Sequence, residues 1–374
     1  MKKKKILYVI YSMDMGGIET LLINIIKKID KNKFSINFLL WKKENSYFEN
    51  DIIKNSANIY KLRLGKNPII DFFRLLKFFD SNRFDVVHVN SHFYSCIFVL
   101  TAFLKHVPIR ITHFHSFSDN KKKNIIRNIY IFICRSIINI FSTHKFACSI
   151  EAARYGFGKK YKNAIIIKNS INVENYINYN INIVNSIKKD LNIGKNDLVL
   201  GTVGRQTNEK NQMYILHIVN ILVNNMKIKN IKCILVGNGT NNIKLKEETK
   251  KLNLTKHIIF VGEKNNINDY LHCFDIFLFP SIYEGFGLAL LEAQAAGIYS
   301  IASDSIPKIT DMNLNLVKYL SLENIDLWVN EIIKYNKVEI KNDIIKRKII
   351  ENGFDISNTV NELSLIYNGG SINE

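Results

Sequence analysis

The sequence predicts an α/β protein made of two tandem, doubly wound Rossmann-like domains. Its 374 residues are more than one ordinary hydrophobic core accommodates. Short runs rich in β-branched and aromatic residues alternate with helical patterns, and the whole alternation occurs twice along the chain. The runs are almost continuously apolar, which is typical of parallel strands covered by helices on both faces.

The first series of elements occupies the first half of the chain. Its expected strands are residues 5–12, 35–41, 85–91, 110–116, 145–150 and 164–171. Its expected helices, which show apolar residues at helical spacing, are residues 19–29, 69–79 and 124–141.

The second series follows the same plan. Its expected strands are residues 197–204, 231–239, 257–263, 275–281 and 299–304. Its expected helices are residues 212–223, 243–252, 267–274 and 288–296, with closing helical segments at 324–336 and 341–368. Parallel βαβ units bind ligands beyond the carboxyl ends of their strands, so we expect a site in a cleft between two facing sheets.

These patterns suggest four segments. Residues 1–172 form a strongly basic first domain, and residues 197–350 form the second domain. Between them, residues 173–196 are rich in Asn and lack a clean strand, so we expect a linker with a short lead-in helix there. Residues 351–374 are expected to be a C-terminal helix that packs back towards the first domain.

The charge is distributed unevenly along the chain. The net charge is +19, and residues 1–170 carry all of this excess, with 30 Lys and Arg against 11 Asp and Glu. Such a field points to an anionic partner for the first half, either a membrane surface, an anionic lipid carrier or a nucleic acid.

Other features of the composition exclude some classes of protein. No uncharged run of 18 residues occurs, so we expect no transmembrane helix, and the basic start is interpreted as the lead into a buried strand rather than as a signal peptide. The five cysteines are scattered without metal-like spacing, which indicates buried free thiols in a reducing cytoplasm.

The stretch YEGFGLALLEAQAAG, residues 283–297, predicts a turn followed by a helix. Free backbone amides at 286–288, together with the helix dipole, make an anion site at the helix start. Glu292 lies on the apolar side of this helix, where a carboxylate is costly unless a ligand such as a ribose diol satisfies it. The spacing fits a nucleotide sugar, with the sugar at Glu284. Alternatively, Glu284 is a first-turn helix residue and Glu292 a surface residue.

A second motif, GRQTNEKN at residues 204–211, follows the strand expected at 197–204. Arg205 and Lys210 would place two fixed cations at a strand end, where they could neutralise a departing nucleotide diphosphate. The alternative is a solvated helix start.

The Glu-seven residues-Glu spacing with its Gly-Phe-Gly turn resembles the signature of retaining glycosyltransferases of the GT-B fold that use nucleotide sugars. The closest resemblance is to the bacterial "glycosyl transferases group 1" family, which builds capsules, exopolysaccharides and lipopolysaccharide cores. The resemblance implies catalytic roles for Glu284, Arg205, Lys210 and His115. It implies donor binding by Gly16, Gly17, Arg205, Lys210, Glu263, Glu284, Gly285, Phe286, Gly287, Leu288 and Glu292.

Further motifs support this resemblance. Gly16 and Gly17 follow the first strand and look like the family's first glycine loop, although a plain tight turn is the alternative. In Thr112–His115, the histidine that matches the family pattern is His115, which implies contact with the transferred sugar and the acceptor side. A structural role is the alternative for His115, and even more so for His88 and His113. Base recognition is expected from backbone groups near 262–264.

The sequence departs from the family pattern in two places. Where a proline often follows the signature helix, the chain has Gly297-Ile298-Tyr299. Where Pro-Glu is frequent in the next loop, it has Pro307-Lys308, which exchanges an acidic residue for a cation and leaves the donor assignment open.

The resemblance implies a retaining transfer of a hexose or N-acetylhexosamine in which the leaving phosphate takes the acceptor proton. No Asp-any-Asp motif is present, so neither a metal nor another cofactor is expected, and the donor is expected to be a UDP-sugar. The acceptor is expected to be a saccharide, free or linked to polyprenyl diphosphate.

Residues 118–141 are basic at one end and apolar throughout, so the enzyme is expected to be cytoplasmic and peripheral on the inner face of the plasma membrane. An ordinary buried helix is the alternative for this segment.

Other functions remain open at this stage. A nucleic-acid-binding protein would use the basic half but would leave Glu292, Arg205 and Lys210 unexplained, so no nucleic acid is expected as a partner. A nicotinamide oxidoreductase would need a third glycine in the first loop. A sugar-nucleotide epimerase of the same architecture would isomerise its donor with no acceptor.

Overall fold

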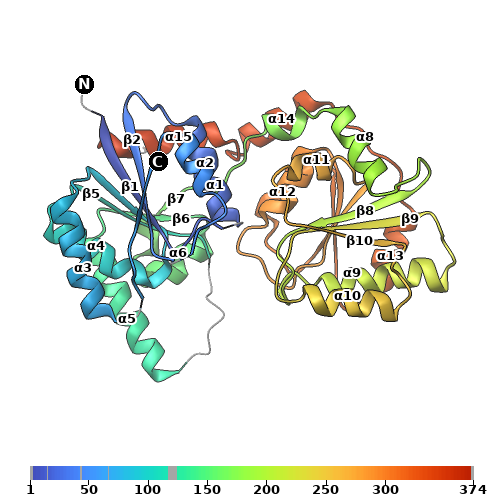
Figure 1. The fold of residues 1–374 in the computed structure, drawn as a ribbon, viewed down its shortest axis with the longest axis horizontal. Helices are drawn as coiled ribbons and strands as arrows, with labels where there is room; N and C mark the ends of the chain where they lie inside the picture. The colour runs from blue at the N-terminus through green and yellow to red at the C-terminus, as the bar shows by residue number, and fades with distance from the viewer. Residues whose placement is uncertain (1–2, 15, 43, 66, 117–123, 372–374) are drawn as a thin grey trace. The chain divides into compact units, whose positions relative to one another are not determined.

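A computed structural model describes residues 3–14, 16–42, 44–65, 67–116 and 124–371 of the chain. The chain divides into two compact units, one made of residues 1–171 and 353–374, and the other of residues 172–352. Each unit contains a parallel sheet with helices packed on it (Figure 1). This confirms the predicted fold class of two parallel α/β domains.

The sheet of the first unit has the strand order β3-β2-β1-β4-β5-β6-β7. Strand β1 pairs in parallel with β2 and β4, so that Ile6 lies between Ile36 and Val86. The strands are β1 (Lys4–Ile10), β2 (Phe34–Leu40), β3 (Asn58–Lys61), β4 (Val86–Val89), β5 (Ile109–Phe114), β6 (His144–Ala147) and β7 (Ile165–Ile166).

Helices cover both faces of this sheet (Figure 1). One apolar core joins the sheet to α1 and α15, and a second core joins it to α3, α4, α5 and α6. The helices are α1 (Gly17–Lys28), α2 (Glu49–Lys54), α3 (Pro68–Ser81), α4 (Ser95–Leu104), α5 (Ile125–Phe141), α6 (Ile150–Phe157) and α15 (Ile356–Tyr367). The local sequence stabilises the start of α3, because Asn67 is its N-cap. The side chain of Asn67 accepts hydrogen bonds from the amides of Ile69 and Ile70.

The sheet of the second unit has the strand order β10-β9-β8-β11-β12-β13. Its strands are β8 (Leu198–Val203), β9 (Ile231–Val236), β10 (Ile258–Gly262), β11 (Ile276–Phe279), β12 (Tyr299–Ser303) and β13 (Val317–Leu320). The chain order runs outward in one direction from β8 and in the other from β11. The switch point of this sheet therefore lies between β8 and β11, where open parallel sheets bind their ligands.

The helices of the second unit are α7 (Glu174–Ile177), α8 (Ile181–Asp190), α9 (Gln212–Asn220), α10 (Asn242–Lys251), α11 (Ile267–Leu271), α12 (Leu288–Ala295), α13 (Ile325–Ile333) and α14 (Asn342–Glu351). Figure 1 shows α9, α10 and α13 together on one face of the sheet, where they enclose a core that includes Trp328. Short 3-10 segments occupy His92–Tyr94, Gly158–Asn163 and Lys308–Thr310 (η1, η2 and η4), and a π-helical turn occupies Ile221–Asn225 (η3).

Two expected boundaries differ from the structure. The segment 173–196, expected to be a linker, forms α7 and α8 and belongs to the second unit, because Tyr176 and Val184 are buried there. The expected helical segment 341–368 is two helices in different units, because Gly353 adopts a positive φ of 73° and Asp355 then caps α15. Among the described residues, no helix has the length and apolar character needed to cross a membrane.

Candidate functional site

The loop between β8 and α9 carries the two predicted cations. Arg205 is exposed, and its carbonyl oxygen accepts a hydrogen bond from the side chain of Gln212. Lys210 is half-buried, and its Nζ lies 5.4 Å from the centroid of the Phe279 ring. The backbone thus directs Lys210 inwards, towards β11, and Arg205 outwards.

This loop is fixed by its neighbour after β9. The amide of Gln206 donates to the carbonyl of Asn238 at 2.9 Å, and its side chain donates to the carbonyl of Gly237 at 3.0 Å. Gly237 has a φ of 122°, and a Cβ atom there would collide with the carbonyl oxygen of Gly204. The glycine therefore allows two strand ends to approach more closely than side chains permit.

Lys210 forms an ion pair with Glu284. Its Nζ lies 2.5 Å from Oε1 of Glu284, which follows β11. Glu284 is 9% exposed, so most of its carboxyl group is withdrawn from solvent. The pair joins the two strand ends that flank the switch point of the sheet.

The helix α12 begins next to this ion pair. Its N-cap is Gly287, which adopts a φ of 90° and provides no side chain to cap the first turn. The amides at the start of α12 are therefore not satisfied by a capping side chain, and the helix dipole adds partial positive charge there. Such a helix start can bind a phosphate.

Glu292 lies in the second turn of α12 and is buried, with 6% of its surface exposed. Its Oε1 accepts a hydrogen bond of 2.8 Å from the hydroxyl of Tyr176. Burial raises the pKa of Glu292 to about 7, while the Tyr176 hydroxyl and the charge of Lys210 oppose that rise. The carboxyl group is therefore near the midpoint of its titration at neutral pH.

We call the group formed by Lys210, Glu284, Glu292 and the start of α12 at Gly287 and Leu288 the switch-point site. The structure brings these sequence-predicted residues together, and Gly285 and the buried Phe286 form the turn that leads into the helix. Arg205 is on the same loop as Lys210. Glu263 is exposed at the end of β10, two strands away from β8.

The loop after β12 is pinned to α12. The fully buried Gln294 donates to the carbonyl of Thr310 at 2.8 Å and accepts from the amide of Met312 at 2.9 Å. Lys308, the cation at the family's acidic position, is exposed, and its Nζ lies 5.1 Å from the centroid of the Tyr319 ring. The departure from the family pattern therefore lies in an ordered loop.

The first unit holds the remaining predicted residues. His115 is buried, its Nε2 lies 2.8 Å from Oδ1 of Asn90, and its Nδ1 lies 3.4 Å from Oδ1 of Asn169. Burial lowers the pKa of His115 to about 4, so the ring is neutral at neutral pH. Sequence reasoning did not single out Asn90, which directly follows β4, or Asn169, which lies three residues after the end of β7.

His88 and His113 have the structural role that was the alternative for them. Nδ1 of His88 lies 2.8 Å from the hydroxyl of Tyr367, and its Nε2 lies 3.2 Å from Nδ1 of His113. The Tyr367 hydroxyl lies 2.7 Å from that of Tyr8. Burial lowers the pKa of both histidines, that of His88 to about 3, so both rings are neutral at neutral pH. This chain of contacts connects α15 to the sheet.

The first glycine loop is only partly described, because Met15 lies outside the described residues. Gly16 is the N-cap of α1 in an extended conformation, and Gly17 is the first helical residue. A Cβ atom on Gly16 would collide with the carboxylate of Glu19 in the first turn of the helix. These glycines thus begin α1 at the carboxyl end of β1, which borders the switch point of the first sheet.

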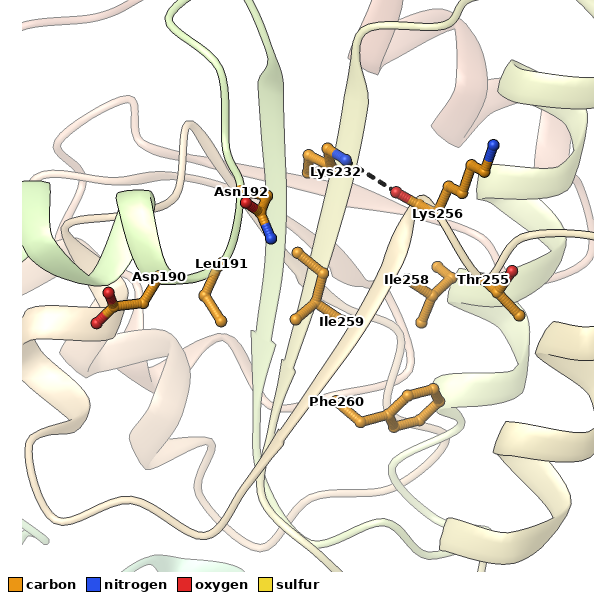
Figure 2. Close-up of a pocket in the computed structure, with 9 residues that line it drawn as sticks. All are labelled: Asp190, Leu191, Asn192, Lys232, Thr255, Lys256, Ile258, Ile259 and Phe260. Atoms are coloured by element: carbon orange, nitrogen blue, oxygen red, sulfur yellow. Dashed lines mark hydrogen bonds between the residues drawn. The ribbon is translucent and has the colours of Figure 1, made fainter.

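One depression of the second unit has no predicted site residue in its lining. It has a volume of about 610 Å³ and lies along the edge strand β10, between the end of α8 and the start of β9 (Figure 2). Lys232 donates to the carbonyl of Lys256 at its rim, at 2.9 Å. No group of three or more His, Cys, Asp or Glu side chains in the described part of the chain is arranged to hold a metal ion.

Two family patterns match the chain and together span most of it. "Glycosyltransferase Family 4" matches residues 15–174, and "Glycosyl transferases group 1" matches residues 184–353. The second match contains the whole switch-point site, and the first contains His115 and the glycine loop.

Three curated relatives extend over nearly the whole chain. The glycosyltransferase EpsF of Bacillus subtilis (strain 168) is 28% identical over 98% of this chain and 97% of its own. The UDP-Gal:alpha-D-GlcNAc-diphosphoundecaprenol alpha-1,3-galactosyltransferase of Escherichia coli is 24% identical over 98% and 97%. The capsular polysaccharide biosynthesis glycosyltransferase CapH of Staphylococcus aureus is 29% identical over 97% and 98%.

Among solved structures, HepE of Anabaena in complex with UDP and glucose shares the fold. It superposes with a TM-score of 0.80 at 16% sequence identity, covering 98% of this chain and all of its own.

Proposed function

Because this chain belongs to the glycosyl transferases group 1 family and is a glycosyltransferase of the GT-B fold, we propose that it uses a nucleotide sugar as donor. It transfers a hexose or N-acetylhexosamine to a saccharide acceptor, free or lipid-linked, in the synthesis of a bacterial surface polysaccharide. The relatives named for capsule synthesis and for a lipid-diphosphate acceptor support this reaction.

One observation carries the proposal: next to the carboxyl ends of β8 and β11, the switch-point site combines a cation, a helix start without a side-chain cap and two carboxyl groups. Lys210 and the start of α12 suit a diphosphate, because a lysine and helix amides both stabilise phosphate charge. The buried Glu292 lies eight positions after Glu284. Its carboxylate suits a ligand whose hydroxyl groups donate hydrogen bonds, such as a ribose.

The donor proposed is a UDP-sugar. The Escherichia coli relative is named for UDP-Gal, and the Anabaena structure contains UDP and glucose. In this arrangement Arg205, Lys210 and the amides at Gly287 and Leu288 hold the diphosphate and stabilise its charge as it departs. Base recognition falls to backbone groups at the end of β10, near Glu263.

We propose transfer with retention of the anomeric configuration. The bond between the anomeric carbon and the phosphate oxygen breaks, and the acceptor oxygen bonds to the same face of the sugar. The proton of the acceptor hydroxyl passes to the departing phosphate oxygen, so no side chain needs to act as the base. We assign to Glu284, which forms an ion pair with Lys210, the role of accepting hydrogen bonds from the transferred sugar.

We further propose that the first unit docks on an anionic bilayer that carries the acceptor. The helix α5 exposes a stripe of large apolar residues, which includes Ile125, Ile129 and Phe132 at 78%, 55% and 68% exposure. The first half of the chain also holds the whole basic excess, which attracts anionic headgroups. Residues 118–123, the lysine-rich part of the predicted surface segment, lie outside the described residues.

The test is binding followed by transfer. Thermal shift and calorimetry with UDP-, GDP- and ADP-sugars, and with the free nucleoside diphosphates, should show the strongest stabilisation by uridine compounds. NMR of the product formed with a lipid-linked N-acetylglucosamine acceptor should then show retention, with and without EDTA. Absence of binding by every nucleotide would overturn the proposal, and donor isomerisation without acceptor would favour an epimerase.

A further inference from the structure

We propose that Tyr176 is a positioning residue of the donor site, whose hydroxyl orients the Glu292 carboxylate and holds it ready for the donor ribose. This inference rests on the proposed function, because it assumes that Glu292 receives the nucleotide. Tyr176 lies in the segment expected to be a linker, and nothing in the motif at 283–297 points to it.

The contact itself is buried and direct. The hydroxyl of Tyr176 donates a 2.8 Å hydrogen bond to Oε1 of Glu292, and the two residues are 8% and 6% exposed. Among the hydrogen bonds found for the described residues, none involves Oε2 of Glu292. One carboxylate oxygen is therefore engaged by the protein, and the other remains for a ligand hydroxyl.

The backbone around Tyr176 is held independently of its hydroxyl. His272 is the residue after α11, and its Nε2 donates a hydrogen bond of 2.6 Å to the carbonyl of Tyr176. Asn342 of α14 donates to the carbonyl of Ile177 at 3.0 Å, and Lys346 of α14 lies 2.5 Å from Glu174. Since these contacts fix α7, removal of the hydroxyl alone should leave the ring in place.

The hydrogen bond affects the ionisation of Glu292 as well as its direction. A buried carboxylate is stabilised by donors to its charged form, and Tyr176 supplies such a donor in a site where burial favours the neutral acid. The other charge acting on Glu292 is Lys210. Two other elements that pack against α12 also carry a lysine. Lys346 of α14 forms an ion pair with Glu174, and Lys308 of η4 lies over the Tyr319 ring.

The test compares Tyr176→Phe with Tyr179→Phe and the wild type. Tyr179 is a matched control three residues along the chain, since its ring stacks on His272 at 3.8 Å and is 45% exposed. The affinity for UDP is measured by calorimetry from about pH 6 to pH 9, near and above the pKa of Glu292. Glu292→Gln gives the reference curve, which contains only the titration of UDP and of other groups.

For Tyr176→Phe, we expect UDP affinity about tenfold weaker at neutral pH and a midpoint of the pH profile shifted upwards. At high pH we expect partial recovery, because Glu292 is then ionised but still lacks the hydroxyl that orients it. Tyr179→Phe should follow the wild type. An unchanged profile for Tyr176→Phe, or an equal loss at every pH, would overturn the positioning role. If the wild type itself bound no uridine nucleotide, the proposed function would fail first, and the inference would fail with it.

Discussion

Nζ of Lys210 lies 2.5 Å from Oε1 of Glu284, although 74 positions separate the two residues in the chain. The contact links the loop after β8 to the loop after β11, which are neighbouring strands at the switch point of the second sheet. Both side chains are largely withdrawn from solvent, with 25% and 10% of the side-chain surface of Lys210 and Glu284 exposed. The pair is therefore a fixed feature of the site, and each partner leaves the other with an uncompensated charge when it is removed.

Replacement of Lys210 by Met removes the charge and retains most of the length of the side chain. We expect kcat/KM to fall by about 10²- to 10³-fold, because the proposed reaction uses Lys210 as a donor to the departing phosphate. Lys246→Met is the matched control, since Nζ of Lys246 also lies over a phenylalanine ring, 5.8 Å from that of Phe260, but on the exposed side of α10.

The coupling within the pair is measured by a double-mutant cycle. Glu284→Gln should cost much less in the Lys210→Met background than in the wild type, because the two residues act as one unit. Additive losses in kcat/KM would show that the ion pair has no part in the reaction.

At Glu292, stability and donor binding are expected to oppose each other. We expect Glu292→Gln to stabilise the free protein and to weaken donor binding. The pKa of Glu292 is about 7 in the folded state against 4.5 in the unfolded state. Between these values the folded state binds more protons, so its stability falls as pH rises and is lowest above pH 7. The wild type loses at most about 3 kcal/mol in this way, and glutamine avoids that loss.

Thermal unfolding of both proteins between about pH 5 and pH 8 checks this sign. The advantage of Glu292→Gln should be absent at the acidic end and should grow with pH, while UDP affinity is lower throughout. Asp343→Gln, on the surface helix α14, is the control and should show no such growth. A destabilised Glu292→Gln protein at pH 8 would contradict the expectation.

The close approach of two loops at Gly237 leads to a stability prediction. Gly237→Ala places a methyl group against the carbonyl of Gly204 at a φ of 122°, where an alanine is strained. We expect a loss of about 2 kcal/mol or more in the free energy of unfolding, together with weaker donor binding, because the Arg205 loop is displaced. Gly262→Ala, which has a φ of 70° but open space around its Cβ, separates strain from collision.

The repeated βαβ pattern and the motif at 283–297 were sufficient to predict the fold class and most of the switch-point site. They succeed because strands covered on both faces produce apolar runs, and because a glycine turn before a helix gives a local signal. The helix α4 was missed for a related reason. Its sequence SCIFVLTAFL is apolar on nearly all sides, so it shows no helical period.

Tyr176 could not be predicted from local pattern. Its helix α7 has only four residues, too few to show a period, and it lies at the start of the Asn-rich segment 173–196, which resembles a linker. The role proposed for Tyr176 depends on a contact with Glu292, 116 positions away in the chain. The same holds for Asn90 and Asn169, which are recognisable only once the strands beside them place them around His115.

The exposed stripe on α5 gives the prediction for membrane docking. We expect Ile129→Asp combined with Phe132→Asp to reduce binding to phosphatidylglycerol-containing vesicles at least tenfold, because it removes buried apolar area and adds repulsion from the anionic surface. Ile243→Asp is the control, since Ile243 is 73% exposed on α10 of the second unit. Sedimentation with vesicles at low and high salt measures binding, and transfer to a water-soluble acceptor should be unchanged. Equal binding by all three proteins would show that the stripe on α5 does not contact lipid.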